Sequence, residues 1–264
     1  MKITPTWARK RFGQHFLVNT QVIDAIVAAA GVRRGDRLVE IGPGRGALTG
    51  SLLDAAGALD VIEIDRDLAG MLRERYPDQT QLRVHEADAL HFDFNALAAA
   101  RGGPLRLVGN LPYNISTPLL FRLLDFAPVL ADLHVMLQRE VVERMAAAPG
   151  SEAYGRLTVM LAPWMDVEPL FEVMPEAFRP APKVWSAVAR LTMRATPRFE
   201  LSPRFAAVVA AAFSHRRKTI RNALRGLASA AQIEAAGIDG GLRPEVLSPQ
   251  DFNRLATALD CKLG

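Results

Sequence analysis

Short apolar runs alternate with longer amphipathic stretches over the first 140 residues of the chain. The apolar runs predict buried strands at residues 37–41, 59–64, 81–86, 105–108 and 133–137. An amphipathic stretch at residues 20–31 predicts a helix ahead of the first strand, and helix-length segments separate the later strands. Strands that alternate with helices form parallel sheets with right-handed crossovers. We therefore expect an α/β domain built on a mainly parallel, doubly wound sheet.

The pattern changes in the second half of the chain. After a predicted helix at residues 154–164, the runs at 168–173 and 184–193 are typical of an antiparallel pair of strands that closes the sheet. Residues 194–197 form a linker, and the pattern beyond it is helical. The sequence thus predicts a large domain over residues 1–194 and a small helical domain over residues 195–264.

The positive charge of the chain is concentrated in its C-terminal part. Residues 194–264 hold 11 Lys and Arg against 6 Asp and Glu, whereas residues 1–193 hold 21 against 22. A basic domain attached to a neutral one indicates a polyanionic partner such as nucleic acid.

Composition excludes several classes of protein. Half of the residues are hydrophobic, yet no run approaches the ~20 apolar residues that span a bilayer, and no apolar leader segment follows the basic N-terminus. The single cysteine, Cys261, rules out an internal disulfide, and the five histidines lack the spacing of metal ligands. We expect a cytoplasmic protein that binds no membrane and no metal and is monomeric when free.

A glycine-rich loop follows the first predicted strand. Residues 42–46 read Gly-Pro-Gly-Arg-Gly and lead into a helix-compatible segment. Gly42 and Gly44 let the backbone turn tightly and approach a ligand, and the helix that follows presents free N–H groups. Strand, glycine loop and helix in this order indicate a nucleotide site. The loop also satisfies a dinucleotide fingerprint, so alone it does not identify the cofactor.

Two acidic residues at the following strand ends narrow the choice of cofactor. Glu63 lies at the end of the second predicted strand, where a carboxylate can accept both hydroxyls of a ribose. Asp88 follows the third strand and can accept a hydrogen bond from an adenine amine. Either residue can instead be a solvated strand end or a helix N-cap. Together with the loop they favour S-adenosylmethionine over a dinucleotide, because no hydride-handling residue follows Asp88.

The tetrapeptide Asn110-Leu111-Pro112-Tyr113 follows the fourth strand and combines an amide, a rigid proline and an aromatic ring. The lone pair of adenine N6 is delocalised into the base, so methylation requires acceptors that localise it. The Asn110 oxygen and a backbone carbonyl held by the fixed φ of Pro112 can accept both N6 hydrogens, while Tyr113 stacks on the base. No general base is needed, because the ammonium product is strongly acidic. An ordinary strand-to-helix turn is the alternative.

Four of these candidates end successive predicted strands: Gly42, Glu63, Asp88 and Asn110. Ligands of open α/β sheets bind at the carboxyl ends of the strands. A fifth candidate, Phe178, begins a stiff proline-containing segment at residues 178–183. Its ring can complete a stacking sandwich with Tyr113 around an extruded base, and a buried loop aromatic is the alternative.

A group of basic residues lies in the predicted helical tail. Arg217, Arg221 and Arg225 recur every four residues, with Arg216 and Lys218 beside them. On one continuous helix this spacing gives a cationic stripe. We interpret the stripe as a contact for RNA phosphates, although many such stripes are merely solvated faces.

Taken together, the motifs resemble the small-subunit ribosomal RNA adenine N6,N6-dimethyltransferase family. The resemblance rests on the order of segments 9–17, 40–49, 63–65, 88–89, 110–117, 178–186 and 213–222. It implies a Rossmann-like methyltransferase domain with a small helical RNA-binding domain. It also implies that S-adenosylmethionine supplies methyl groups to N6 of two adjacent adenosines in the 3′-terminal hairpin of 16S rRNA. The substrate would be a pre-30S or 30S particle during maturation of the small subunit.

The resemblance further assigns cofactor contacts along the chain. His15 and Leu17 would contact S-adenosylmethionine from the N-terminal segment, Gly42 its methionine part, and Asn110 both the cofactor and the target amine. Two residues depart from the common pattern. His15 stands where Asn is frequent, and Arg45 stands in the glycine loop where smaller or apolar residues are common.

Three other functions compete with this interpretation. A large-subunit (23S) rRNA adenine methyltransferase would share the catalytic domain, but the resemblance at residues 216–222 favours the small-subunit enzyme. A DNA adenine methyltransferase would need a target-recognition domain for which the tail leaves little room. A non-catalytic assembly or transcription factor would not need Asn110, Pro112 and Tyr113.

Overall fold

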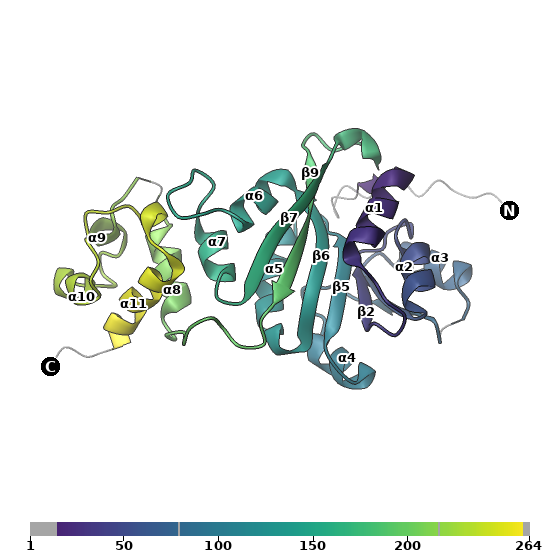
Figure 1. Cartoon of the computed structure of the whole chain (residues 1–264), viewed down its shortest axis with the longest axis horizontal. Helices are drawn as coiled ribbons and strands as arrows, with labels where there is room; N and C mark the ends of the chain where they lie inside the picture. Colours follow the sequence, from purple (N-terminus) through teal and green to yellow (C-terminus); the bar gives the residue numbers. More distant parts are fainter. Residues whose placement is uncertain (1–14, 79, 216, 261–264) are drawn as a thin grey trace. The chain divides into compact units, whose positions relative to one another are not determined.

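The computed structural model describes residues 15–78, 80–215 and 217–260, which belong to two compact units (Figure 1). The first unit contains residues up to 142 together with 166–195. The second contains residues 143–165 and those from 196 onward. None of the helices in these described ranges is long and apolar enough to cross a membrane.

The first unit is built on a seven-stranded sheet with the order β4-β3-β2-β5-β6-β9-β7. Its strands are β2 (Leu38–Ile41), β3 (Leu59–Glu63), β4 (Leu82–Glu86), β5 (Leu105–Asn110), β6 (Leu130–Gln138), β7 (Met165–Val173) and β9 (Ser186–Met193). The pairs from β4 to β6 are parallel, whereas β9 is antiparallel to β6. The predicted mainly parallel, doubly wound sheet is therefore confirmed.

The strand order reverses at β2, because β3 and β4 extend the sheet to one side and β5 and β6 to the other. Right-handed crossovers then place α2 (Thr49–Ala56) and α3 (Arg66–Arg75) on the opposite face from α4 (Phe94–Arg101) and α5 (Ser116–Leu124). The carboxyl ends of β2 and β5 lie side by side at this reversal, which is where open α/β sheets bind ligands.

Local sequence signals define the helices around the sheet. The helix α1 (Thr20–Ala30) begins where the Asn19 side chain accepts a hydrogen bond from Val22 N at 3.1 Å. It ends at Gly31, whose φ of 54° suits the left-handed cap of a helix. Asp65 caps α3 in the same way as Asn19 caps α1. The strands β2 and β3 are buried along their whole length, as expected for the centre of a parallel sheet.

Two short strands bring the N-terminal segment against a distant loop. β1 (Phe16–Leu17) pairs antiparallel with β8 (Phe178–Arg179), so that Leu17 lies opposite Phe178. The backbone N–H of Val18 adds a hydrogen bond of 2.8 Å to Ala177 O. The hydrophobic spacing of the sequence does not predict this pair, because each strand has only two residues and the partners are about 160 positions apart.

The second unit is helical, with α7 (Arg156–Leu161), α8 (Phe205–Ala212), α9 (Ile220–Ala223), α10 (Ala230–Ala235) and α11 (Pro249–Asp260). Its boundary corrects the predicted division at residue 194, which placed residues 143–165 in the first domain. Tyr154 and Val159 are buried with Phe205 and Phe252 in the core of the second unit. The Tyr154 hydroxyl also donates a hydrogen bond of 2.7 Å to Leu247 O.

The predicted continuous cationic helix is wrong. The helix α8 ends at Ala212, and α9 begins only at Ile220, whose side chain is fully buried. The N–H groups of Ile220 and Arg221 bond to Leu242 O and Gly240 O, which lie outside any helical ladder. Because these tertiary bonds fix the start of α9, Arg217 precedes that helix. Arg225 follows it in a turn.

Candidate cofactor and base site

The glycine loop lies at the switch between β2 and β5. Gly42 and Gly44 have φ angles of 66° and 58°, values that favour glycine. A Cβ atom on Gly44 would come within 3.2 Å of the Phe16 ring. The loop therefore needs glycine both for its backbone conformation and for the close approach of the N-terminal segment.

Glu63 accepts two backbone hydrogen bonds, one of which ties it to this loop. Its Oε2 accepts from Gly44 N at 3.0 Å, and its Oε1 accepts from Asp65 N at 2.9 Å. Burial raises the pKa of the Glu63 carboxyl, while these two hydrogen bonds act to lower it. Each oxygen keeps a lone pair for a further donor. Glu63 can thus accept hydrogen bonds from two ribose hydroxyls at the end of β3.

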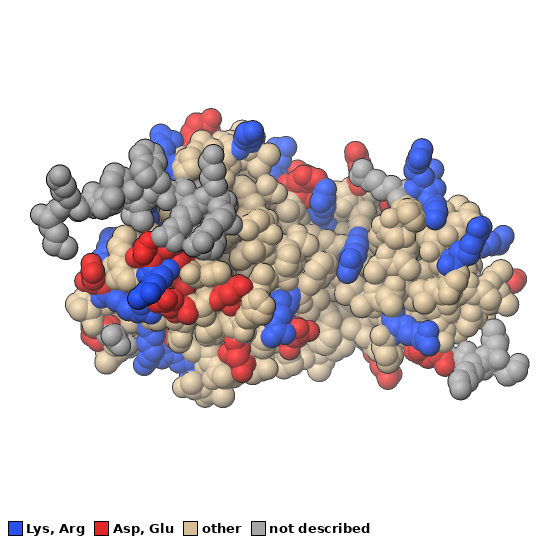
Figure 2. Space-filling model, turned by 180° about the vertical axis from the view of Figure 1, so that it is seen from behind, with Lys and Arg blue, Asp and Glu red and all other residues tan. Residues whose placement is uncertain are grey.

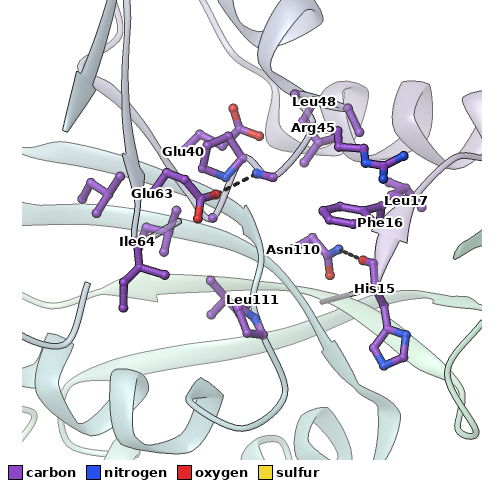
Figure 3. A pocket seen from close by; sticks show the side chains of 18 of the residues that line it. His15, Phe16, Leu17, Glu40, Arg45, Leu48, Glu63, Ile64, Asn110 and Leu111 are labelled. Carbon is purple, nitrogen blue, oxygen red and sulfur yellow. Dashed lines mark hydrogen bonds between the residues drawn. The ribbon is translucent and has the colours of Figure 1, made fainter. Parts of the chain in front are cut away.

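Asn110 ends β5, next to the glycine loop. Its Nδ2 donates a hydrogen bond of 3.0 Å to the carbonyl oxygen of His15. Because a carbonyl can only accept, this bond fixes the amide nitrogen toward His15 and leaves Oδ1 on the other side (Figure 3). Asn110 therefore presents an acceptor oxygen of fixed orientation.

Tyr113 is held at two points. Its hydroxyl lies 2.6 Å from Ser186 Oγ, at the start of β9. Its ring packs against the His15 imidazole with a centroid distance of 5.5 Å and an angle of 30° between the rings. Burial raises the pKa of the Tyr113 hydroxyl, so the ring remains a neutral stacking surface.

The segment from His15 to Leu17 covers the glycine loop. His15 Nδ1 lies 2.8 Å from Pro180 O, and the Arg45 guanidinium lies over the Phe16 ring at 4.6 Å from its centroid. Arg45, whose direction the sequence did not indicate, thus faces the N-terminal segment. Leu17 is buried.

These residues surround one cavity of about 630 Å³ in the first unit (Figure 3). This volume lies in the usual range for small-molecule and cofactor sites. The structure brings to it most of the residues that the sequence singled out: His15, Leu17, Gly42, Glu63, Asp88, Asn110, Pro112 and Tyr113. Asp88 also accepts hydrogen bonds from Leu90 N and His91 Nδ1, each at 2.9 Å. It therefore serves its own turn as well as lining the cavity.

Phe178 is not among the residues that line the cavity. Its side chain has 0% exposure and belongs to the hydrophobic core, because β8 pairs with β1 and turns this ring inward. The prediction that Phe178 faces Tyr113 across a base is therefore corrected for this structure, and the alternative, a buried loop aromatic, describes its position.

The sequence did not single out Glu40, which also lines the cavity. Its carboxyl is buried in β2 and accepts a hydrogen bond of 2.6 Å from Thr49 Oγ1. Burial, helped by the nearby charge of Glu63, raises the pKa of Glu40 to about 8 against the opposing effect of Thr49. The sequence did contain a signal for Glu40, because it is an acidic residue within an otherwise apolar predicted strand.

Replacing Glu40 by Gln should change the pH dependence of stability. Between the ordinary pKa of 4.5 and a folded value of about 8, the folded wild type keeps a proton that the unfolded chain releases. Its free energy of unfolding therefore falls as pH rises through this window, by up to about 1.4 kcal/mol per pH unit. Glu40→Gln removes this contribution. The free energy of unfolding of the variant should therefore rise relative to that of the wild type as pH increases from 5 to 8. Chemical unfolding at pH 5, 6.5 and 8 measures the difference.

The exposed Glu74 in α3 offers a matched control for this measurement. Glu74→Gln should follow the wild-type dependence on pH. If the free energy of unfolding changes with pH in parallel for the wild type and Glu40→Gln, Glu40 is ionised in the folded protein throughout this range.

The predicted RNA-binding residues lie in the second unit. Arg217, Lys218, Arg221 and Arg225 are exposed, and Arg216 lies outside the described residues. Arg225 donates a hydrogen bond of 3.0 Å to the Asn222 side chain. On the face seen in Figure 2, some Lys and Arg side chains stand singly among neutral ones, whereas others lie beside Asp and Glu. The four described cations lie in α9 or within a few residues of its ends, and we call them the basic surface around α9.

Comparison with known proteins matches both the sequence and the fold. The family model for ribosomal RNA adenine dimethylase matches residues 6–260. A relative from Xanthomonas oryzae pv. oryzae, ribosomal RNA small subunit methyltransferase A, is 55% identical over 94% of this chain and 95% of its own length. A protein of the same name from Pseudomonas aeruginosa is 52% identical over 96% of this chain and 94% of its own.

Two solved structures resemble most of the chain. A dimethyladenosine transferase from Plasmodium falciparum has a TM-score of 0.78 and 26% identity, covering 93% of this chain and 98% of that protein. The 23S rRNA methyltransferase ErmE has a TM-score of 0.70 and 30% identity, covering 93% of this chain and 100% of that protein. Both cover the second unit as well as the first.

Proposed function

The chain belongs to the ribosomal RNA adenine dimethylase family, and from this premise we propose that it dimethylates N6 of two adjacent adenosines in the 3′-terminal hairpin of 16S rRNA. S-adenosylmethionine is the methyl donor, and the substrate is a pre-30S or 30S particle. The reaction belongs to maturation of the small ribosomal subunit. The observation that carries the proposal is the fixed orientation of Asn110 Oδ1 beside Tyr113 at the edge of the cavity.

The cavity suits the proposed cofactor. The chemistry that S-adenosylmethionine supplies when bound is an electrophilic methyl group on a sulfonium. Glu63 would accept hydrogen bonds from its ribose, and Asp88 would accept one from its adenine amine. Gly42, whose φ of 66° favours glycine, presents no side chain and so lets the backbone approach the methionine part closely.

The tetrapeptide prepares the target amine. Asn110 Oδ1 and a carbonyl of the segment fixed by Pro112 accept the two N6 hydrogens and localise the nitrogen lone pair. Leu111 N donates a hydrogen bond of 3.1 Å to Met136 O, which holds this segment on the neighbouring strand. Because the acceptors bind the developing ammonium better than the planar amine, they lower the barrier to methyl transfer. The proton leaves to water afterwards.

Similarity favours the small subunit as substrate. The two small-subunit methyltransferases described above are 52% and 55% identical to this chain, whereas the 23S rRNA methyltransferase is 30% identical. Incubation of the protein with labelled S-adenosylmethionine and separate unmethylated small and large subunits tests this choice. Label is expected in the small subunit. Label in the large subunit alone would contradict the proposal, and RNA binding without any label would favour a non-catalytic assembly factor.

The basic surface around α9 should contribute to RNA affinity through phosphates. Arg217→Ala combined with Arg221→Ala should weaken binding to the small subunit and reduce the slope of log affinity against log salt by about one unit for each lost contact. Filter binding at several salt concentrations measures both quantities. Arg33→Ala removes one exposed cation in the first unit and should leave the slope unchanged. An unchanged slope in the double variant would place the RNA contact elsewhere.

A further inference from the structure

An exposed aromatic residue directly precedes, in the chain, a residue that contacts the proposed base site, and its role rests on the function proposed above. Trp185 is 43% exposed, and its neighbour Val184 is 44% exposed. The next residue, Ser186, is fully buried and lies 2.6 Å from the Tyr113 hydroxyl. Trp185 is thus the residue before Ser186. Ser186 in turn contacts Tyr113, the ring proposed to stack on the target adenine.

The sheet fixes where this residue lies. β6 separates β5 from β9, and Met136 of β6 is opposite both Asn110 and Val188. With strands about 4.8 Å apart, β9 lies about 10 Å from β5. Because β9 is antiparallel, its first residues lie at the sheet edge where β5 ends. Arg139 N donates a hydrogen bond of 2.9 Å to Trp185 O, so the backbone at Trp185 is anchored to the end of β6.

The proposed reaction creates a need for a second stacking surface at this edge. A base that enters a cavity leaves the stack of its strand, and its neighbour loses a stacking partner. Since both target adenosines are adjacent in sequence, the one that is not in the cavity lies beside its mouth. An aromatic side chain there can replace the lost stacking.

We propose that Trp185 is a stacking platform for the nucleobase adjacent to the adenosine being methylated. Val184 extends the apolar surface, and the exposed Lys183 places a positive charge beside it for the adjoining phosphate. The positive charge of Arg139, whose backbone bonds to Trp185, is balanced by an ion pair with Glu172 at 3.7 Å. The platform therefore recognises the face of a base more than the backbone.

The test compares Trp185→Ala and Trp185→Phe with the wild type in binding and methylation of unmethylated small subunits. Trp185→Ala should weaken affinity about 5- to 100-fold, the range for loss of one base–aromatic stack. Trp185→Phe should restore most of it. The salt slope and the affinity for S-adenosylmethionine should both stay at wild-type values, because neither a phosphate nor a cofactor contact is removed.

Met174→Ala is the matched control, since Met174 is an apolar side chain of the same unit with 51% exposure. It should bind small subunits as the wild type does. Affinity of Trp185→Ala within twofold of the wild type would overturn the proposal. So would a lower kcat with unchanged affinity, since that result would mean that Trp185 only positions Tyr113 through Ser186.

Isolated 16S rRNA distinguishes a base from a protein partner. The same loss of affinity on intact subunits and on isolated RNA supports a base platform. A loss confined to intact subunits would overturn it in favour of contact with a ribosomal protein. Failure of the proposed function can be distinguished from failure of the Trp185 proposal. If the proposed function is wrong, the wild type itself will not methylate small subunits.

Discussion

Asn110→Ala is expected to lower kcat for methyl transfer about 10²- to 10³-fold, the usual effect of removing one preorganised group that stabilises a transition state. The variant loses the oxygen that the His15 carbonyl orients through Nδ2, so the N6 lone pair stays delocalised. Binding of small subunits should remain near that of the wild type. Affinity for S-adenosylmethionine should fall less than about tenfold, as for one neutral hydrogen bond. Single-turnover kinetics with labelled S-adenosylmethionine measure the effect.

A matched control is Asn95→Ala, which removes an exposed amide from α4. This variant should methylate at the wild-type rate. Turnover of Asn110→Ala within a few-fold of the wild type would remove the amide from the chemical step and favour an ordinary turn at residues 110–113.

Glu63→Gln is expected to raise the dissociation constant for S-adenosylmethionine about 10- to 100-fold, the range for hydrogen bonds to a charged acceptor. In the wild type both carboxylate oxygens already accept backbone N–H groups, from Gly44 and Asp65. In Glu63→Gln the amide NH₂ replaces one of these oxygens, so two donors face each other. An NH₂ opposite Gly44 N would displace the glycine loop, and one opposite Asp65 N would displace the end of β3. Isothermal titration calorimetry measures the change.

The same residue gives cofactor binding a dependence on pH. Only the ionised Glu63 carboxylate accepts on both oxygens, and burial raises its pKa above 4.5. Wild-type affinity should therefore fall on the acid side as pH decreases through that raised value, whereas Glu63→Gln should lack this fall. Glu86→Gln is the control, because Glu86 lies opposite Glu63 in the register of β3 and β4 but pairs with Arg73 at the surface. Equal affinities of Glu63→Gln and the wild type would exclude the ribose contact.

The sheet and the cavity follow from local features of the sequence. Apolar runs locate buried parallel strands because neither face of such a strand meets water, and the carboxyl ends of parallel strands meet at one edge of the sheet. For this reason the order of residues along the chain is enough to place Gly42, Glu63, Asp88 and Asn110 around one site.

The errors of prediction have a shared physical cause. Phe178 is turned into the core by a two-residue strand pair with Leu17, and α9 is started by backbone bonds to Leu242 and Gly240. These contacts join residues far apart in the chain or are specific to one fold. The spacing of hydrophobic residues in the sequence indicates neither the strand pair nor the backbone bonds that start α9. It also did not single out Glu40, because a buried carboxyl reads as a break in an apolar pattern until its partner, Thr49, is known.

Mass spectrometry of nuclease digests shows directly whether the protein dimethylates two adjacent adenosines. Unmethylated small subunits are incubated with the protein and S-adenosylmethionine, and the nucleosides of the 3′-terminal hairpin are then sequenced. We expect N6,N6-dimethyladenosine at two adjacent positions with the wild type and unmodified adenosines with Asn110→Ala. Methylation at another atom, at a single isolated position, or at undiminished level with Asn110→Ala would contradict the proposed function.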